Sequence, residues 1–585
     1  MTARREYDAI RRAANPLQLD LIESFVAGRL PRREFVRMGL LLGMTGATIA
    51  ACGGANSIPT STGSAGQTTG VGVGGGTAGS VKTGGTMKIA SVPPAGPLDS
   101  VKMVDLAAYG LVAQCYEFLV YTSGDLQLKP GLATEWKPNA DATEWTFTLR
   151  QGVTWQKDGS PLTADDVIST FDRLSAAGNS ALKGVIDKGS VTSPDGKSVV
   201  FKLNGPNGNF PYLVSPDNAQ SPIIPKSQAD GATLDKEQNG TGPWKITKFD
   251  AKTGATFVRN DKWWGTKTPL DSVEWVFFSD LQPQVVALQS GQVDAIVQFQ
   301  ANGGEALLNN SNLTVISLKS ANHRQVWMRT DKGAFKDPQV REALAWTLDR
   351  DAMVKSLWKG TADVAADTVI APVYPFADTS LPARTQDIDK AKALLASAGA
   401  TNLKATLHAV KLQEIPDLAT LIKSDAAKAG ITLDIQVEDG STFYGKQWCP
   451  EKPADPPCSG ASDLGIVDYG HRGTPDVYLN AALSGGGVWN SSQYNSKDFD
   501  AAFKAYQASI GVDAQKAACR KISDIMQKDT PILVPYFYQY LAAHSTKYVG
   551  MATTALGQVD LTACGLKAGS LLARARRTEC AGDGS

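Results

Sequence analysis

Hydrophobic and polar residues follow two different periods along most of this chain, and these periods predict strands and helices in turn. Residues 144–149 alternate polar and apolar side chains one by one, as a half-buried strand does. A helix is predicted to begin after Thr163, because Thr163 and Asp166 can form a capping box before residues that share one apolar face. Asp195-Gly196 lies between two β-rich runs and predicts a hairpin turn.

Two later segments repeat the pattern of a helix start. Asp337 offers a capping carboxylate, and Pro338 suits the first turn of a helix. Residues 387–398 show the same design, and Gly399 is expected to end that helix. The apolar positions of both segments are expected to be core, and no repeat at solenoid spacing is visible. Strands and helices mixed from about Thr86 onward indicate an α/β protein with two or more lobes.

Residues 1–51 are typical of an export signal. Arg32-Arg33 precedes an uncharged apolar stretch, residues 38–51, which is about half as long as the ~20 residues that a spanning helix needs. Small residues then lead to Cys52, and this order resembles a bacterial lipobox, in which the cysteine is lipidated after cleavage. We therefore expect Cys52 to anchor the mature protein at the outer face of the cytoplasmic membrane. The paired arginines resemble a twin-arginine signal, and the choice between the Tat and Sec routes stays open.

Residues 52–83 are rich in Gly, Ser and Thr and contain almost no large apolar side chain. Such a composition behaves as a flexible coil, so we expect a linker between the anchor and the folded body. Residues 74–79 match the G-x-G-x-x-G string of nucleotide sites. A dinucleotide site needs that string between a strand and a helix, and neither is predicted here, so no nucleotide cofactor is expected.

The charge of the chain argues against nucleic-acid binding. Lys and Arg together number 58, as do Asp and Glu, so the formal net charge is zero. Because residues 1–51 hold eight Arg and five acidic residues, their removal leaves a net charge of about −3. No basic stripe is implied, and a nucleic-acid partner is not expected.

Six of the seven cysteines remain for pairing once Cys52 carries a lipid. Cys449 and Cys458 bracket a proline-rich loop, and in an oxidising compartment we expect them to form a disulfide, the alternative being two free thiols. Cys564 and Cys580 are a weaker second pair. The other two, Cys115 and Cys519, lie in helix-like segments, and we expect them to be buried. There is no CxxC motif and there are only four histidines, so neither a structural zinc nor a catalytic metal is expected.

Several short sequence motifs together resemble those of one protein family. They occur in the same order as in that family and are spread over nearly all of the mature chain. These motifs are residues 84–89 (GGTMKI), 128–136 (LKPGLATEW), 145–153 (WTFTLRQGV), 162–167 (LTADDV), 240–245 (GTGPWK), 260–264 (NDKWW), 287–294 (ALQSGQVD) and 337–344 (DPQVREAL), followed by Trp489-Asn490 ahead of Tyr494. The chain thus resembles the family 5 extracellular solute-binding proteins of ABC importers, which include dipeptide-, oligopeptide- and nickel-binding members.

The resemblance implies an α/β, two-lobed periplasmic-binding-protein-like fold, type II and of the large peptide-binder class, with a hinge that the chain crosses twice. Lobe I would comprise residues 84–320 and 534–585, and lobe II residues 321–533. Closure of the lobes would desolvate a bound ligand and strengthen each polar contact. A membrane permease would read the closed form, and we expect the binding protein itself to be a monomer.

The resemblance also implies where a peptide's α-ammonium is held. Peptide-binding members use an aspartate in a loop of the second lobe, and the Asp-Tyr pair Asp468-Tyr469 ahead of Pro475 resembles that loop. We take Asp468 as the ammonium anchor, because a desolvated carboxylate needs a cationic partner. Its spacing from Pro475 is longer than expected, so Asp463 or Asp476 stays open as the counterpart. A solvated loop aspartate is the structural alternative.

Other binding residues are expected around that anchor. Residues 534–540 resemble the family's return crossing, and Tyr538 is the expected ligand contact there. Strand alternation predicts that Tyr536, Tyr538 and Tyr540 share one face. The other cleft-lining candidates in the second lobe are Arg472, Trp448 and Trp489. By contrast, Trp263-Trp264 in the first lobe is expected to be structural.

Capture of a short peptide for import is therefore the leading hypothesis. An oligosaccharide is the second choice, since tryptophans can stack on sugar rings, and nickel or a metal chelate is the third. A ligand sensor and an adhesive lipoprotein are further alternatives. An enzyme is not expected, because no G-x-S-x-G elbow occurs and acidic residues are too common for their presence to count.

If Cys52 carries the lipid anchor, Cys52→Ser should release the mature protein from the membrane, because the thiol that forms the thioether is lost. Cell fractionation followed by immunoblotting measures this release. A Ser64→Ala variant in the same linker is the control and should stay with the membrane. Retention of the Cys52→Ser protein at the membrane would contradict the assignment.

Overall fold

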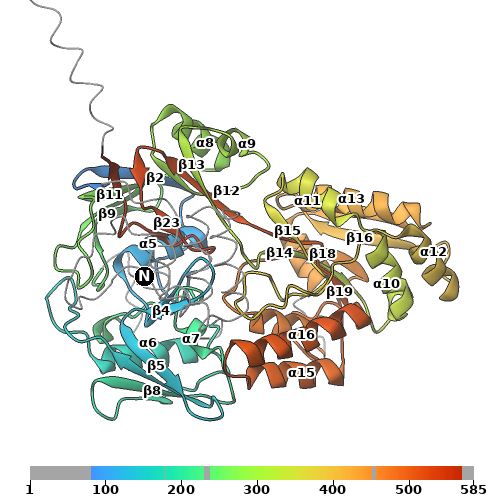
Figure 1. Ribbon diagram of the computed structural model, residues 1–585, viewed down its shortest axis with the longest axis horizontal. Coiled ribbons are helices and arrows are strands. Elements are labelled where there is room, and N and C mark those ends of the chain that lie inside the picture. Colours follow the sequence, from blue (N-terminus) through green and yellow to red (C-terminus); the bar gives the residue numbers. More distant parts are fainter. Residues whose placement is uncertain (1–80, 104, 178–179, 230–237, 451–455, 569–585) are drawn as a thin grey trace, which may run out of the picture. The chain divides into compact units, whose positions relative to one another are not determined.

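The computed structural model describes residues 81–103, 105–177, 180–229, 238–450 and 456–568 (Figure 1). The predicted signal, the predicted linker and the anchor Cys52 lie outside the described residues. Cys580, which was expected to pair with Cys564, also lies outside them. Within the described part, none of the helices combines the length and the apolar character that crossing a bilayer requires.

A mixed seven-stranded sheet forms the core of the first lobe, in the order β13-β21-β12-β2-β11-β10-β9. Its strands are β2 (Thr86–Ser91), β9 (Trp244–Asp250), β10 (Gly254–Arg259), β11 (Ser272–Phe277), β12 (Ala295–Phe299), β13 (Leu313–Leu318) and β21 (Tyr540–Ser545). The central strand β2 runs parallel to β11 and β12, and the other neighbours are antiparallel. Met87 and Ile89, which lie on one face of β2, and Ala90, which lies on the other, are fully buried there, while Lys88 is exposed. The helices of this lobe's core are α5 (Leu106–Cys115), α8 (Leu281–Ser290) and α9 (Glu305–Leu308).

A second, smaller sheet of the first lobe has the order β5-β6-β8-β7. Its elements are β5 (Ala133–Pro138), β6 (Glu144–Leu149), α6 (Ala164–Ala176), β7 (Val191–Thr192), β8 (Ser198–Lys202) and the short helix α7 (Phe210–Leu213). The predicted strand, capped helix and hairpin are therefore confirmed: Thr163 and Asp166 form the capping box, and β7 pairs with β8 around Asp195-Gly196. The aromatic rings of Phe147, Phe171 and Phe201 meet edge to face in the core between α6 and this sheet.

The second lobe is built on another seven-stranded sheet, in which β15-β20-β14-β18-β16-β17 follow one another and β19 also pairs with β14. Its strands are β14 (His323–Met328), β15 (Ala362–Val364), β16 (Lys404–Val410), β17 (Thr432–Glu438), β18 (Leu464–Tyr469), β19 (Ile532–Leu533) and β20 (Tyr536–Tyr538). Its helices are α10 (Pro338–Thr347), α11 (Arg350–Trp358), α12 (Ile388–Ser397), α13 (Ile415–Lys428), α14 (Gly440–Thr442), α15 (Lys497–Gln507) and α16 (Val512–Asp529), with π-helical turns η3 (Phe443–Trp448) and η4 (Tyr478–Leu483).

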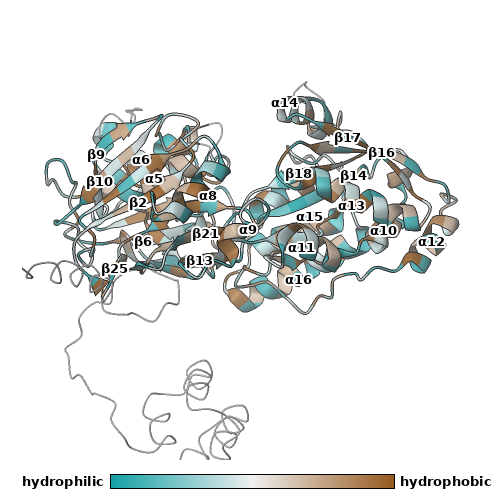
Figure 2. Cartoon of the chain, turned by 90° about the horizontal axis from the view of Figure 1, so that it is seen from above, coloured by the Kyte–Doolittle hydropathy of each residue, from teal (hydrophilic) through white to brown (hydrophobic). Residues whose placement is uncertain are grey.

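The two predicted helix starts of this lobe are also confirmed. Asp337 accepts a hydrogen bond from the Gln339 amide at the start of α10, and Asp387 accepts one from the Lys390 amide at the start of α12. Gly399 follows the end of α12 with a φ of 67°, which favours glycine. Figure 2 shows both polar and apolar residues along these helices, as is typical of helices with one buried face.

The chain passes between the two large sheets twice. The first passage joins β13, which ends at Leu318, to β14, which begins at His323. The second occurs at Gln539, between β20 of the second sheet and β21 of the first. The chain therefore leaves the second sheet a few residues after position 534, where lobe I was expected to resume. Tyr536 and Tyr538 still lie in strand β20 of the second sheet.

Several hydrogen bonds join the first lobe to the second lobe. Near the first passage, His471 Nε2 lies 3.3 Å from Asp217 Oδ1, and both side chains are buried. Farther along the chain, the Gly208 amide donates to the Gln507 carbonyl at 2.8 Å. A Cβ atom at Gly208 would lie 2.0 Å from the Ser509 carbonyl oxygen, so this backbone contact requires a glycine.

The remaining strands form small pairings at the edges of the first lobe. They are β1 (Val81–Lys82), β22 (Tyr548–Val549) and β25 (Gly565–Lys567) in one sheet, the hairpin of β23 (Ala552–Thr553) and β24 (Val559–Asp560), and the pair β3 (Val120–Thr122) and β4 (Leu128–Pro130). A short 3₁₀ turn, η1 (Lys226–Gln228), lies in this lobe, and another, η2 (Ala334–Lys336), lies in the second lobe. The β23–β24 hairpin returns the end of the chain to helix α5, where Gln114 Nε2 donates to the Val559 carbonyl at 2.8 Å.

A buried ion cluster stabilises the second lobe and generates a prediction. Asp367, which is fully buried, receives hydrogen bonds at 2.6 to 2.8 Å from the guanidinium groups of Arg350 and Arg384. Because Asp367→Ala leaves two buried cations without their carboxylate, it should lower the free energy of unfolding by about 3–5 kcal/mol. Denaturant unfolding measures the change.

The matched control is Asp363→Ala, which removes a more exposed aspartate paired with Lys319. It should change the free energy of unfolding by no more than about 1 kcal/mol. Equal effects of the two substitutions would show that the buried cluster does not stabilise the fold.

Candidate functional site

Asp468, the predicted ammonium anchor, lies next to a buried arginine of the neighbouring strand. In the antiparallel pairing of β14 with β18, Arg324 stands directly opposite Asp468, and Arg324 Nη1 contacts Asp468 Oδ1. The guanidinium also bonds Glu414 through two contacts of 2.7 and 2.9 Å. The cross-strand register therefore gives Asp468 a cation within the protein, which the sequence alone did not reveal.

The charges of this cluster do not balance. Arg324 is fully buried, the side chain of Glu414 is 4 % exposed and that of Asp468 is 26 % exposed. One guanidinium thus faces two carboxylates, and Asp468 is the member of the group that solvent reaches. A second cation arriving from solvent would restore neutrality and gain charge-assisted hydrogen bonds there.

Tyr538 stands beside Asp468, although the two come from different strands. The Tyr538 hydroxyl lies 3.0 Å from Arg324 Nη1 and 3.2 Å from Asp468 Oδ1, and its ring lies under the Arg324 guanidinium at 4.5 Å. Trp358 stacks on the same ring with centroids 4.4 Å apart, which fixes the orientation of Tyr538. Burial raises the pKa of the Tyr538 hydroxyl, against the opposing effect of Arg324, so this group stays neutral.

The expectation that Tyr540 shares a face with Tyr536 and Tyr538 is wrong. The passage at Gln539 interrupts the strand, so Tyr540 belongs to β21 of the first sheet and donates to the Val297 carbonyl at 2.6 Å. Tyr536 is fully buried and donates to Glu414 at 2.9 Å. Side chains alternate between the two faces of a sheet only within one strand. The alternation does not continue when the chain passes to another sheet.

Tyr469, Trp448 and Trp489 meet in one aromatic cluster of the second lobe. Their ring centroids are 6.3 to 6.4 Å apart. Tyr469 is only 6 % exposed and stacks on His323, so most of its surface serves packing. Trp448 and Trp489 are half-buried, so part of each side chain is exposed to solvent.

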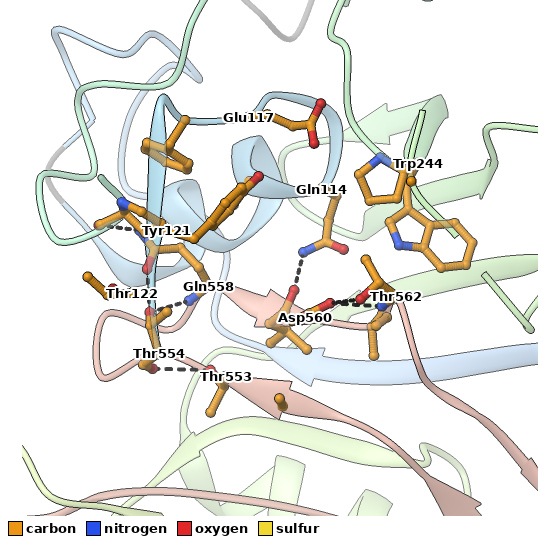
Figure 3. Close-up of a pocket in the computed structure, with 18 of the residues that line it drawn as sticks. Gln114, Glu117, Tyr121, Thr122, Trp244, Thr553, Thr554, Gln558, Asp560 and Thr562 are labelled. Carbon is orange, nitrogen blue, oxygen red and sulfur yellow. Dashed lines mark hydrogen bonds between the residues drawn. The ribbon is translucent and has the colours of Figure 1, made fainter. Parts of the chain in front are cut away.

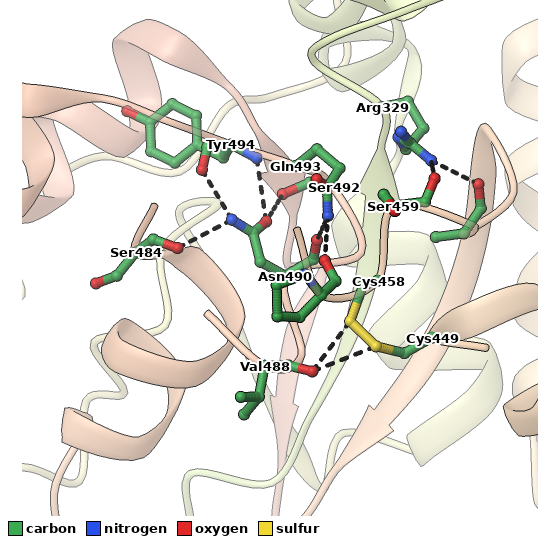
Figure 4. The surroundings of a disulfide bond; sticks show 12 residues. Arg329, Cys449, Cys458, Ser459, Ser484, Val488, Asn490, Ser492, Gln493 and Tyr494 are labelled. Atoms are coloured by element: carbon green, nitrogen blue, oxygen red, sulfur yellow. Dashed lines mark hydrogen bonds between the residues drawn. A yellow bond between two sulfur atoms is a disulfide. The ribbon is translucent and has the colours of Figure 1, made fainter. Parts of the chain in front are cut away.

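A disulfide bond between Cys449 and Cys458, the expected pair, lies beside this cluster (Figure 4). Both sulfur atoms approach the Val488 carbonyl oxygen, at 3.3 and 3.0 Å. Asn490 holds the following turn through hydrogen bonds from its amide to the carbonyls of Ser484 and Tyr494. The disulfide therefore closes the loop between Cys449 and Cys458 and lies against the segment that carries Trp489.

Arg472 and the alternative aspartates occupy other surroundings. Arg472 is half-buried and donates to the His471 carbonyl at 2.7 Å. Asp463, with its side chain 54 % exposed, lies 3.6 Å from Lys332. Asp476 contacts Asn209 of the first lobe at 3.2 Å, and burial raises its pKa. Among the three candidate aspartates, Asp468 is the one that lies beside Tyr538.

A cavity of about 110 Å³ lies within the first lobe and was not predicted (Figure 3). Its walls come from α5 and the turn after it, from the segment around Trp244, from Trp263 and Trp264, and from the β23–β24 hairpin. Both tryptophan indoles of the Trp263-Trp264 pair donate to the Glu117 carboxylate, at 3.1 and 2.9 Å. The pair thus has the structural contact that we expected, and its indoles also line this cavity.

Two acidic residues of the cavity have perturbed ionisation. Burial raises the pKa of Glu117 to about 7, and it raises the pKa of Asp560 to about 6. The indole nitrogen of Trp244, a fully buried residue, has no hydrogen-bond partner in the described part of the chain. The signal in the sequence was weak: Glu117 is a single acidic residue inside an otherwise uncharged run, residues 106–124. Across residues 81–568, apart from the gaps named above, no three Asp, Glu, His or Cys side chains gather as metal ligands would.

Comparison with known proteins bears on this architecture. Residues 127–512 match the model of a family described as bacterial extracellular solute-binding proteins, family 5. The dipeptide-binding protein of Escherichia coli is 24 % identical over 481 residues, which cover 76 % of this chain and 85 % of that protein. Protein XP55 of Streptomyces lividans is 27 % identical over 474 residues, which cover 77 % of this chain and 83 % of that protein.

Solved structures show the same fold. HbpA2 from Haemophilus parasuis is similar with a TM-score of 0.73 at 21 % identity, covering 83 % of this chain and all of that one. The periplasmic binding protein DppA from Helicobacter pylori, in complex with the peptide STSA, gives a TM-score of 0.65 at 22 % identity, covering 83 % of this chain and 99 % of that one. These likenesses confirm the expected periplasmic-binding-protein fold.

The raised pKa of Glu117 predicts a dependence of stability on pH. The folded protein holds this proton up to about pH 7, whereas a carboxyl in the unfolded chain loses it near its usual value of 4.5. Unfolding therefore releases a proton between these values, and the free energy of unfolding falls as the pH rises through them. Relative to Glu117→Gln, the wild type should lose about 2–3 kcal/mol between about pH 5 and pH 8.

Denaturant titrations of both proteins at the two pH values measure this difference. Glu135→Gln, which replaces an exposed glutamate of β5, is the matched control and should run parallel to the wild type. A Glu117→Gln curve that also runs parallel would mean that Glu117 is already ionised in the folded protein at the lower pH.

Proposed function

Because this chain belongs to the bacterial extracellular solute-binding proteins of family 5, we propose that it captures a short peptide and delivers it to an ABC permease. The two lobes would close on the ligand about the passages at residues 319–322 and at Gln539. Relatives whose names state a ligand support peptides first, since they include a dipeptide-binding protein and an oligopeptide-binding protein. The role is binding and release, without a chemical step.

The observation that carries the proposal is the surplus negative charge around Arg324. Glu414 satisfies one face of the guanidinium from within the lobe, while Asp468 stays partly open to solvent. The α-ammonium of a peptide would bond Asp468 and would be oriented by the Tyr538 hydroxyl. Tyr469, which follows Asp468, would act through packing, because it is almost fully buried.

The remaining proposed contacts suit the rest of a peptide. Trp448 and Trp489 offer half-buried aromatic surface for side chains. Arg472 offers a cation for a carboxylate of the ligand. The same tryptophans support the alternative of an oligosaccharide or another ring-bearing solute, which would stack on them. A sensor that presents its ligand to a membrane receptor would use the same contacts.

The proposal includes export and anchoring. Removal of residues 1–51 and lipidation of Cys52 would hold the protein at the outer face of the membrane, where a permease could receive its ligand. Residues 52–83 would serve as the flexible linker. The protein would act as a monomer, with the permease as its protein partner.

Asp468→Asn tests the ammonium contact when it is combined with a matched pair of ligands. Trialanine carries the ammonium, and N-acetyl-trialanine lacks it. Wild type should bind trialanine more tightly than the acetylated peptide by about 2–5 kcal/mol, as expected for a partly desolvated charge pair. Asp468→Asn should lose that preference, and isothermal titration calorimetry measures all four affinities.

Asp463→Asn, at an exposed aspartate five positions earlier, is the control and should keep the preference. An undiminished preference in Asp468→Asn would show that the ammonium is held elsewhere. Mass spectrometry of solute co-purified with the wild-type protein distinguishes a peptide from a sugar.

A further inference from the structure

We propose that the cavity in the first lobe binds a compact organic cation that also carries a hydrogen-bond acceptor. A primary ammonium beside a carbonyl group, as in an amino-acid amide, is the simplest molecule of this class. The site differs from the contacts proposed for Asp468, because all the residues that line it belong to the first lobe. It therefore adds a second binding site to the protein.

The cavity is acidic and is not neutralised from within. Glu117 and Asp560 both line the cavity together with Tyr121, and the charges of both act on the Tyr121 hydroxyl (Figure 3). Among the described residues that line it, none is Lys, Arg or His. The positive charge that acts on Glu117 is that of Arg150. This guanidinium lies over the Trp264 ring at 4.0 Å and donates to the Gly131 carbonyl. A guest cation would therefore meet carboxylates that lack a direct protein counter-ion.

The ionisation of these groups agrees with such a guest. Burial holds both carboxyl pKa values above their usual range, and hydrogen bonds from Thr562 oppose this effect at Asp560. The pKa of the Tyr121 hydroxyl is raised well above its usual value by burial and by the charges of Glu117 and Asp560. When a positive charge enters the cavity, it stabilises the ionised form of a buried carboxyl and lowers the raised pKa.

Aromatic rings complete the cation's surroundings. Tyr121, Trp244, Trp263 and Trp264 all line the cavity. Ring faces attract organic cations, and they do so more strongly where water is excluded. Trp263 and Trp264 are held in place because their nitrogens are bonded to Glu117, so their rings do not have to be ordered when the guest binds.

An unpaired donor shows that the guest needs an acceptor as well. The Trp244 indole nitrogen is buried without a hydrogen-bond partner in the described structure. Figure 3 shows this nitrogen on the side of the ring that faces Gln114 and Asp560. Burying an N–H group without a partner is unfavourable, so a carbonyl oxygen of the guest would satisfy it. A simple alkylammonium would leave this donor unpaired and should bind more weakly.

The size of the cavity limits the guest. A volume of about 110 Å³ corresponds to a few water molecules, each of which takes roughly 30 Å³ in the liquid. A molecule of about five or six heavy atoms fits, such as glycinamide. The same chemistry occurs at the amino-terminal residue of a peptide, so the guest is either a free solute or the end of a longer ligand.

Titration of the full-length protein with three small probes tests the proposal. Glycinamide carries the cation and the acceptor, methylamine carries the cation alone, and acetamide carries the amide alone. We expect saturable binding of glycinamide, with methylamine and acetamide each binding at least tenfold more weakly. Calorimetry, or the fluorescence of the cavity's tryptophans, measures the three affinities.

Two variants assign the binding to the cavity. Asp560→Asn removes a half-buried carboxylate at the end of β24 and should weaken glycinamide binding at least tenfold. Trp244→Phe removes the unpaired donor and should abolish the advantage of glycinamide over methylamine. Glu135→Gln, at an exposed glutamate of β5 outside the cavity lining, is the control and should bind glycinamide as the wild type does. If Asp560→Asn does not fold, Trp244→Phe alone decides the question.

Competition with trialanine, measured in Asp468→Asn so that neither ligand binds at the proposed second-lobe anchor, separates the two sources of the guest. Displacement of glycinamide would assign the cavity to the end of a peptide, and simultaneous binding would assign it to a separate solute. No saturable binding of glycinamide, or binding that neither cavity variant changes, would overturn the proposal. The comparison of trialanine with N-acetyl-trialanine tests Asp468, whereas glycinamide binding tests Asp560 and Trp244. The proposed peptide contact can therefore fail while the cavity proposal holds, and the reverse is also true.

Discussion

The buried guanidinium of Arg324 imposes the main constraint on the second lobe. Arg324 lies on β14, an interior strand of the sheet, and is fully buried, so its charge and its donors must be matched within the protein. Glu414, at the start of α13, and Asp468, on the neighbouring strand, supply the carboxylates. This requirement fixes the register of β14 against β18 and the position of α13, and it brings Tyr538 to the same place.

The surplus carboxylate links this constraint to ligand capture. A neutral cluster would serve stability alone, whereas a cluster with one carboxylate in excess retains affinity for a cation from outside. The first lobe shows a related arrangement in Glu117 and Asp560, which are held in an aromatic cavity without a direct counter-ion. In both places desolvation makes an added positive charge favourable. The two lobes differ in that the second supplies its own arginine and the first supplies aromatic rings and an unpaired donor.

Local elements could be predicted because their signals are local. The helices after Thr163, Asp337 and Asp387 begin where a side chain can cap the first turn, and that hydrogen bond involves residues two or three positions apart. The hairpin turn at Asp195-Gly196 also depends on a hydrogen bond between residues three positions apart, from the Ser198 amide to Asp195. The alternation from Tyr536 to Tyr540 failed, because the chain changes sheet at Gln539 and the sequence does not mark that change.

The sequence by itself determined the helix caps and the hairpin, and it led us to expect the pairing of Cys449 with Cys458. It also showed the short motifs in the order in which they occur in the family. It also placed Asp468 and Tyr538 among the candidate residues. Only the tertiary structure decided that Arg324 stands opposite Asp468, 144 positions apart, and that Gln114 meets the β23–β24 hairpin 445 positions later. Capping and turn formation depend on neighbours along the chain, whereas charge balance and cavity chemistry depend on which distant segments packing brings together.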